Sequence, residues 1–216
     1  MSTPSRALSR SETALITVRL LEGAALALPA ILQPGPLQAF YLSRSVAHGW
    51  RRTLPAAFAP VLTDGPIFAV VLFVLTRFPE AWLRGVQGVG GLFLLWLAWG
   101  AWRRARRPHA VEADPAAAGR SLRDGMTVNF LNPNPYLFWS TVAGPIFLEA
   151  WASSPASALA FVGGFYGTFV VGLAVTIVVF ATLGRLSAGA SGRLGIVSAV
   201  ALAGFGVFQI VRALTG

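Results

Sequence analysis

The sequence predicts an all-α membrane protein whose six transmembrane helices form two inverted three-helix repeats, with the first and fourth helices broken by proline. Three observations lead to this prediction. Of the 216 residues 55% are hydrophobic and 12% are charged, and the mean hydropathy of +0.66 is too high for a soluble chain of this length. Six apolar runs are long enough to cross a bilayer. One proline motif occurs in both halves of the chain.

The apolar runs define the expected helices and domains, because a membrane-spanning helix needs about 20 mostly apolar residues. The six runs are, in chain order, 20–42, 54–75, 82–102, 126–148, 156–182 and 194–214. They divide the chain into an N-terminal tail (1–19), a first three-helix repeat (20–102), a cytoplasmic linker (103–125) and a second three-helix repeat (126–216). Because three is an odd number, the second repeat is expected to enter the membrane inverted.

The basic residues predict the orientation. All seventeen are arginines, and most of them lie between apolar runs, which is typical of topology signals and not of a nucleic-acid-binding surface. Eleven fall in the first, third and fifth connections, and six fall on the other side, three of these in the N-terminal tail. The positive-inside rule places the eleven in the cytoplasm. Both termini are therefore predicted to lie outside the cytoplasm.

The repeated proline motif predicts two broken helices. It is Gln33-Pro34-Gly35-Pro36 in the first run and Asn132-Pro133-Asn134-Pro135 in the fourth. Within a helix each proline removes a hydrogen-bond donor and crowds the carbonyl four residues earlier. Unpaired backbone is tolerated in a membrane only where it is buried in protein or lines a wet cavity. Two breaks at matching places predict one shared internal cavity.

Asp64 is the only acidic residue deep inside an apolar run. A carboxylate at that depth is costly unless it is paired, hydrated or protonated, so it is a functional-site hypothesis. We expect Asp64 to be the coupling group, which binds a proton or cation or pairs with a substrate ammonium. The alternative is that Asp64 lies near the cytoplasmic headgroups, twelve positions after Arg52, and only caps a helix broken at Pro66.

Amide side chains surround the expected breaks. Such side chains donate and accept hydrogen bonds, which suits a zwitterion, and helix N-termini that restart after the prolines favour a carboxylate. The alternative is that the amides only pair with backbone that the prolines have broken. The expected substrate-binding residues are Gln33, Pro34, Gly35, Pro36, Asn129, Asn132, Asn134 and Trp139. Trp139 and Phe138 are expected as cavity walls, and Gly163, Gly164 and Gly167 as helix-packing positions.

Several function classes find no support in the sequence. The chain has no cysteine, which excludes disulfides and thiolate metal sites. His48 and His109 are far apart in the sequence and no metal-ligand spacing occurs, so neither a metal site nor a cofactor is expected. No nucleophile with a nearby base and no phosphate-binding loop is present, so an enzyme is not expected. A transporter remains, or a membrane scaffold whose proline kinks are filled by neighbouring side chains.

Three motifs resemble those of the LysE/RhtB amino-acid exporters. They are Pro34-Gly35-Pro36, the segment Gly90-Gly91-Leu92-Phe93-Leu94-Leu95-Trp96-Leu97, and Asn129-Phe130-Leu131-Asn132-Pro133. The similarity spans about residues 20 to 214. It implies a multi-pass protein of the inner (plasma) membrane that exports amino acids or related small metabolites. It also implies a proton or sodium gradient as the driving force, and a homodimer, because many relatives are dimers. Two inverted repeats around one shared site predict alternating access.

The sequence departs from the family at one informative place. The family commonly has lysine and a small residue after the asparagine-proline pair, where this chain has Asn134-Pro135. A preference for basic or neutral substrates therefore does not carry over. The wider superfamily also implies an alternative, a cation or metal-ion exporter, although one intramembrane carboxylate is little for a divalent ion.

Overall fold

The computed structural model describes residues 4–33, 35–74, 80–106, 116–185 and 188–215, and no strand occurs among these residues. The all-α prediction is confirmed for this part of the chain. The helices are α1 (Pro4–Leu32), α2 (Pro36–His48), α3 (Trp50–Thr53), η1 (Leu54–Phe58), α4 (Ala59–Val74), α5 (Glu80–Ala105), α6 (Ala117–Phe130), α7 (Pro133–Phe138), η2 (Trp139–Ala143), α8 (Gly144–Ser153), α9 (Pro155–Arg185) and α10 (Ala188–Thr215).

Four stretches of the described helices are long and apolar enough to cross a membrane: Glu12–Leu32, Trp50–Val71, Pro155–Gly184 and Gly192–Thr215. They support an integral membrane protein. The predicted run 126–148 is not among them, and the structure divides it over α6, α7, η2 and α8. Helix α5, of 26 residues, is not among the four either. Six spans in an inverted repeat therefore remain a prediction.

Two helices extend beyond the predicted boundaries. Helix α1 begins at Pro4, so residues 4–19, expected as a tail, continue the first helix. Proline is favoured at the first helical position, and no proline or glycine follows it until Gly23. Helix α5 continues to Ala105 and α6 starts at Ala117, so much of the expected linker is helical, while residues 107–115 lie outside the described part.

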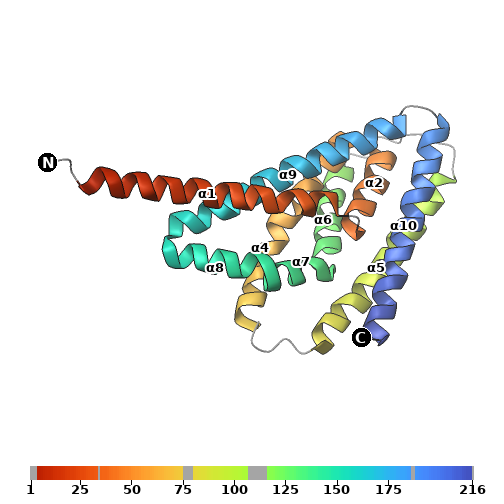
Figure 1. Ribbon diagram of the computed structural model, residues 1–216. Coiled ribbons are helices and arrows are strands. Elements are labelled where there is room, and N and C mark those ends of the chain that lie inside the picture. The colour runs from red at the N-terminus through yellow and green to blue at the C-terminus, as the bar shows by residue number, and fades with distance from the viewer. Residues whose placement is uncertain (1–3, 34, 75–79, 107–115, 186–187, 216) are drawn as a thin grey trace.

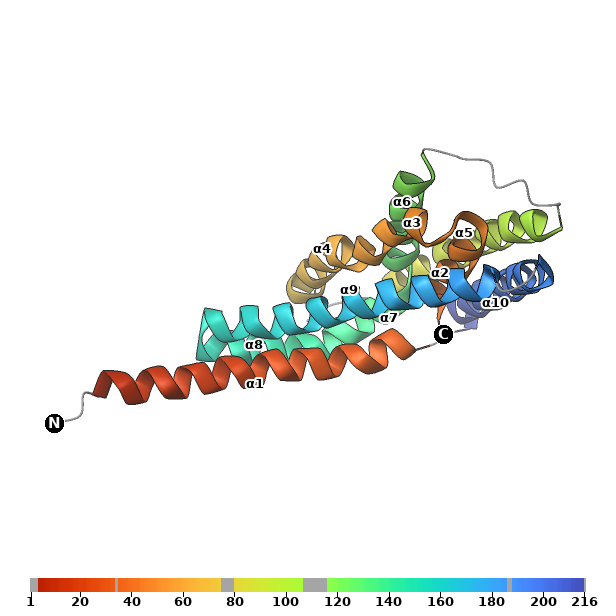
Figure 2. The same ribbon diagram turned by 90° about the horizontal axis from the view of Figure 1, so that it is seen from above.

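The C-terminal part of α1 lies against the N-terminal part of α9 (Figures 1 and 2). Glycine allows the close approach. A Cβ atom on Gly23 would lie 2.1 Å from the carbonyl oxygen of Phe161, and one on Gly164 would lie 2.0 Å from that of Leu20. The packing role expected for Gly164 is therefore confirmed. It does not hold for Gly163 or Gly167, where a Cβ atom would meet nothing within 4 Å.

Helices α5 and α10 form a second pair at the other side of the molecule (Figure 1). Their close contacts join Gly91 with Gly206 and, at the far end, Ala105 with Gly195. The two helices are therefore antiparallel. By the same argument α1 and α9 are parallel, because Leu20 meets Gly164 and, farther along both helices, Ile31 meets Gly172.

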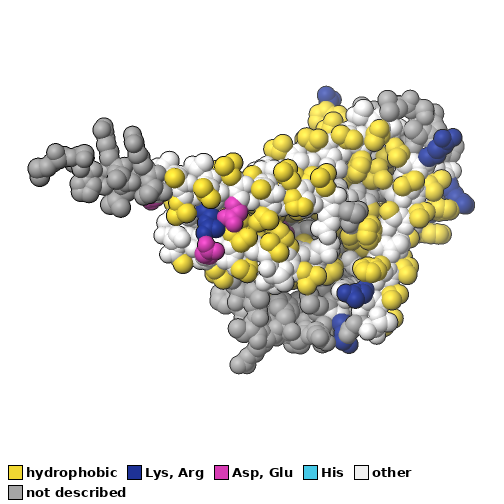
Figure 3. Space-filling model, viewed as in Figure 1, with side chains coloured by type: hydrophobic (Ala, Val, Ile, Leu, Met, Phe, Trp, Pro, Cys, Tyr) yellow, Lys and Arg dark blue, Asp and Glu magenta, His cyan; other side chains and the backbone are white. Residues whose placement is uncertain are grey.

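Between these pairs, α4 packs against α6, α7 and η2, and α2 packs against α9 and α10. Much of the molecular face in Figure 3 is hydrophobic, as expected for a surface that contacts lipid. Charged side chains interrupt it beside α1 and α8, where Arg19 pairs with Glu22 and Glu149 at 2.8 and 2.6 Å. A second ion pair, between Arg44 of α2 and Asp124 of α6, is buried.

Candidate functional site

Both expected helix breaks occur. Helix α1 ends at Leu32 and α2 begins at Pro36, with Gly35 in an extended conformation between them (φ −173°, ψ −177°). Helix α6 ends at Phe130 and α7 begins at Pro133. Asn132 caps α7, because its side-chain oxygen accepts a hydrogen bond of 3.1 Å from the backbone N–H of Asn134.

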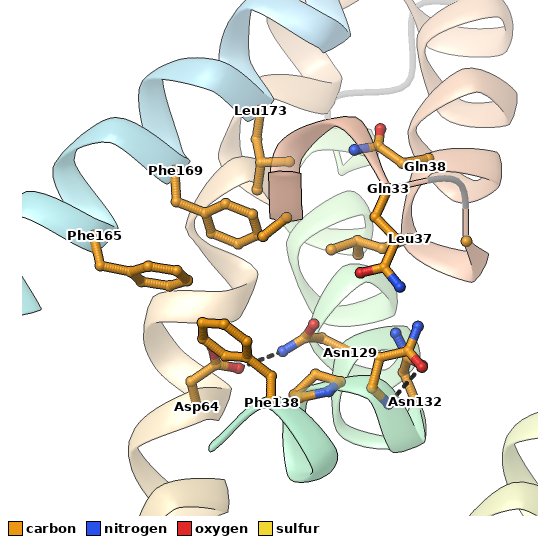
Figure 4. A pocket seen from close by; sticks show the side chains of 14 residues that line it. Gln33, Leu37, Gln38, Asp64, Asn129, Asn132, Phe138, Phe165, Phe169 and Leu173 are labelled. Carbon is orange, nitrogen blue, oxygen red and sulfur yellow. Dashed lines mark hydrogen bonds between the residues drawn. The ribbon is translucent and has the colours of Figure 1, made fainter. Parts of the chain in front are cut away.

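The two breaks face one cavity, shown in Figure 4. Its volume is about 90 Å³, which suits a small solute better than a drug-sized ligand. The breaks lie close together, since a Cβ atom on Gly35 would be 3.9 Å from the side-chain nitrogen of Asn134. The lining residues are Ala30, Gln33, Gly35, Leu37, Gln38, Asp64, Asn129, Asn132, Asn134, Pro135, Phe138, Phe165, Phe169 and Leu173.

Asp64 of α4 lies at the wall of this cavity and is only 5% exposed. Its Oδ1 accepts a 2.7 Å hydrogen bond from Nδ2 of Asn129, drawn in Figure 4. Its Oδ2 accepts from the hydroxyl of Tyr166 at 2.9 Å and from the indole N–H of Trp139 at 3.4 Å. Three elements of the second half of the chain, α6, α9 and η2, thus hold a carboxylate that belongs to the first half.

Asn129 is itself held in place. Its Nδ2 also donates to Oγ1 of Thr63 at 2.7 Å, and the Thr63 hydroxyl donates to the carbonyl of Ala59 at 2.9 Å. The amide is therefore bound to two consecutive residues of α4. Because a side chain fixed by several partners loses little entropy when a ligand binds, this arrangement preorganises the carboxylate.

Asp64 has no cationic partner in the described part of the chain, since none of the ion pairs there includes it. Its partners are neutral donors, and an isolated charge is costly to bury. The carboxylate of Asp64 can therefore bind a proton, a small cation or an ammonium group.

The helix-cap interpretation of Asp64 does not fit this geometry. Pro66 lies inside α4, which continues to Val74 without a break. The hydrogen bonds of the Asp64 carboxylate run to side chains of other elements and not to the backbone of α4. Thr63, one position earlier, is the residue that bonds to the preceding turn.

One wall of the cavity is apolar. Phe165, Phe169 and Leu173 recur every four residues along α9, which places them on one face of that helix (Figure 4). Phe138 of α7 stacks on Phe165 with ring centroids 5.2 Å apart, and Phe165 stacks on Phe169 at 5.3 Å. A flat aromatic surface therefore lies opposite the amides of the breaks.

Some polar side chains at the breaks do pair with the backbone, as the alternative interpretation expected. Asn132 bonds to Asn134 as described, the amide of Gln38 donates to the carbonyl of Ile31, and the hydroxyl of Tyr136 donates to the carbonyl of Phe130 at 2.9 Å. The side-chain oxygen of Gln38 is buried and has no hydrogen-bond partner among the described residues. It remains available for a donor that enters the cavity.

Most of the predicted site residues come together. Those that line the cavity are Gln33, Gly35, Asp64, Asn129, Asn132 and Asn134. Trp139 does not line it but lies behind Asp64, 2% exposed, while Phe138 provides the aromatic wall. Pro36 is the buried first residue of α2 and does not line the cavity, and Pro34 lies outside the described residues.

The sequence interpretation missed the contribution of α9. Tyr166 is the only tyrosine of that helix, but α9 also carries Ser157, Thr168, Thr176 and Thr182, so its hydroxyl did not stand out in the sequence. The spacing of Phe165, Phe169 and Leu173 was visible. It did not distinguish a cavity wall from an ordinary packing face.

One comparison with known proteins identifies the family of the chain. The family model described as LysE type translocator matches residues 28–213, a range that includes both breaks, Asp64 and the aromatic wall. No curated protein and no solved structure matches the chain. Since the matched range covers most of its length, the chain belongs to the LysE type translocator family.

Proposed function

We propose that the protein is a secondary active transporter that exports amino acids or related small metabolites across the plasma membrane. Export is coupled to a proton or sodium gradient by alternating access. Membership of the LysE type translocator family supports an exporter. The observation that carries the proposal is Asp64, a buried carboxylate that forms no ion pair with any described residue, at a cavity formed by two helix breaks.

The chemistry of the cavity matches the parts of an amino acid. An ammonium group would take the unpaired charge of Asp64. A carboxylate would approach the start of α2, where Leu37 and Gln38 line the cavity and the helix dipole favours negative charge. The side group would lie against the aromatic wall of Phe138 and Phe165, which favours an apolar group over a charged one.

The directions of the helices support two inverted halves. In such an arrangement the third and sixth spans are antiparallel, as α5 and α10 are. The first and fifth spans are parallel, as are α1 and α9. The second and fourth spans of such an arrangement are also parallel. The contacts of α4 advance in the same direction along both segments, since Thr63 meets Asn129 and Phe68, farther on, meets Trp139 and Phe147.

The positions of two ion pairs support alternating access. Arg19 lies in α1, before the first break, and pairs with Glu149 of α8, after the second break. Arg44 follows the first break and pairs with Asp124, which precedes the second. Each pair thus joins the two halves on a different side of the breaks. In the proposed cycle, separation of one ion pair exposes the cavity to the outside, and separation of the other exposes it to the inside. Because the two pairs separate in turn, the cavity is exposed to one side at a time.

The test is uptake of a panel of labelled amino acids into inverted vesicles or proteoliposomes under imposed proton and sodium gradients, applied separately. We expect gradient-driven transport of at least one neutral amino acid and its loss in Asp64→Asn, whose amide cannot carry the charge. Glu12→Gln, an exposed carboxyl-to-amide change in α1, is the matched control and should transport normally.

Three results would contradict the proposal. Transport of metal ions or sodium without any amino acid would indicate the cation exporter. Absence of transport for every solute would indicate the scaffold. Normal gradient-driven export by Asp64→Asn would remove that residue from the coupling mechanism.

A further inference from the structure

A groove runs between α5 and α10, and it shares no lining residue with the cavity at Asp64. Its volume is about 350 Å³ and its lining is apolar, with Trp99 and Trp102 on α5 and Ala199, Val200 and Ala203 on α10. It faces outward, because Trp99 is 63% exposed and Val200 is 59% exposed. In a membrane this groove meets lipid.

Arginines extend the α5 side of the groove. Arg103 and Arg106 follow Trp99 and Trp102 by four positions each, so they lie on the same side, one turn farther on. Arg106 directly follows α5, and its backbone N–H still bonds to the carbonyl of Trp102 at 3.3 Å. The guanidinium carbon of Arg106 lies 4.4 Å from the ring centroid of Trp102, and the side chains of both arginines are exposed. The tryptophans therefore lie directly beside positive charge.

Arg193 adds a charge from the α10 side. It is exposed and precedes Val200 by seven positions, which places both residues on one helix face, two turns apart. The same ends of the two helices are in contact, since a Cβ atom on Gly195 would lie 3.0 Å from Cβ of Ala105. Basic side chains are visible at this edge of the molecule in Figure 3. Over residues 103–114 the sequence has four arginines against two acidic residues, so the charge there is positive.

We propose that the groove binds one anionic phospholipid, with an acyl chain between α5 and α10 and the phosphate among Arg103, Arg106 and Arg193. The apolar stretch from Leu95 to Trp102 rises about 10 Å, enough to hold part of one acyl chain. Guanidinium groups bind phosphate oxygens in pairs. Arginines that follow a membrane helix attract anionic headgroups, and tryptophans favour the headgroup level.

The charge argues for a lipid rather than a second copy of the chain. A second copy seated here would bring the same three arginines toward the same edge if it used the same face, as a two-fold dimer does. Like charges would then approach one another without a counter-ion. An anionic headgroup instead supplies the counter-charge, and its chain fills the apolar part.

The experiment is native mass spectrometry of the full-length protein in a mild detergent, with added phosphatidylglycerol or phosphatidylcholine of identical acyl chains. We expect one phosphatidylglycerol to be retained and phosphatidylcholine to dissociate. The double variant Arg103→Gln, Arg106→Gln should weaken retention about 25-fold, at roughly fivefold per arginine, and added salt should weaken it as well. Val200→Phe, which fills the apolar part, should also lose the lipid.

Arg212→Gln is the matched control, because it removes an exposed arginine from the opposite end of α10 and should not change lipid binding. Circular dichroism and elution volume check that each variant is folded. Equal retention of both lipids, or equal loss in Arg212→Gln, would overturn the proposal. A dimer that Val200→Phe converts to a monomer, with lipid binding unchanged, would assign the groove to a second copy of the chain instead.

Discussion

The amide of Asn129 donates a 2.7 Å hydrogen bond to the carboxylate of Asp64, although the two residues are 65 positions apart in the sequence. The bond joins α6, which ends at the second helix break, to α4 in the first half of the chain. Any relative movement of the two halves must therefore stretch or break it. This hydrogen bond makes the environment of Asp64 sensitive to the conformation of the whole molecule.

Tyr166→Phe removes the second strong donor to Asp64 and keeps the aromatic ring. A hydrogen bond to a charged group contributes about 1.5–3 kcal/mol, so we expect a loss of transport activity by roughly tenfold or more. The measurement is the initial rate of gradient-driven uptake per folded protein. Tyr41→Phe is the control, because that hydroxyl donates to the carbonyl of Ala56 at 3.0 Å. It should lower stability by about 1 kcal/mol and leave the rate unchanged. Equal rates for both variants would contradict the prediction.

Breaking the Arg44–Asp124 pair should destabilise the protein strongly. Both side chains are about 90% buried or more, and removing one partner of a buried ion pair costs about 3–5 kcal/mol. We expect Arg44→Gln and Asp124→Asn each to approach this cost, and the double variant to lose less than their sum. Unfolding titrations in mixed micelles measure the change in unfolding free energy of each variant.

Arg123→Gln is the control for the ion pair. Arg123 also lies near Asp124, at 3.7 Å, but its side chain is 74% exposed. Exposed pairs contribute less than about 1 kcal/mol, so its unfolding free energy should change little. Additive losses in the Arg44 and Asp124 double variant would show that the two side chains do not interact.

Alanine substitutions in α1 and α9 should separate packing glycines from neutral ones. Gly23→Ala and Gly164→Ala place a methyl group against backbone carbonyls of the neighbouring helix and should destabilise by about 1–3 kcal/mol. The Cβ atom added by Gly163→Ala would meet nothing within 4 Å, so this variant should instead stabilise the protein by about 0.5–1 kcal/mol. Opposite signs at two adjacent positions, measured by thermal unfolding in detergent, are the expected result. The same sign at both would place the helix contact elsewhere.

Single cysteines should report whether the cavity is open to water, and the native chain has no cysteine to interfere. We expect Gly35→Cys and Asn134→Cys to react with a membrane-impermeant thiol reagent from one side at a time, and bound substrate to slow the reaction. Ala158→Cys, at a fully buried position of α9, is the unreactive control. Reaction from both sides at once would indicate a channel and not a carrier.

The sequence by itself determined the features that depend on local chemistry. Proline lacks a donor wherever it occurs, so the breaks beside Gly35 and Asn132 followed from the motif alone. A carboxylate in an apolar run is costly whatever its neighbours are, so Asp64 was recognisable before its partners were known. The sequence also predicted that the amide of Asn129 lies at the cavity. In the structure it lines the cavity and donates a hydrogen bond to Asp64.

The tertiary structure decided everything that depends on how helices are rotated and which of them are neighbours. Only the approach of α9 brings the Tyr166 hydroxyl to Asp64 and turns Phe165 toward the cavity. The rotation of η2 puts Trp139 behind the carboxylate, while Phe138, one position earlier, forms the wall. An apolar periodicity shows which face of a helix is buried but not what buries it, because many partners of similar hydrophobicity satisfy the same pattern.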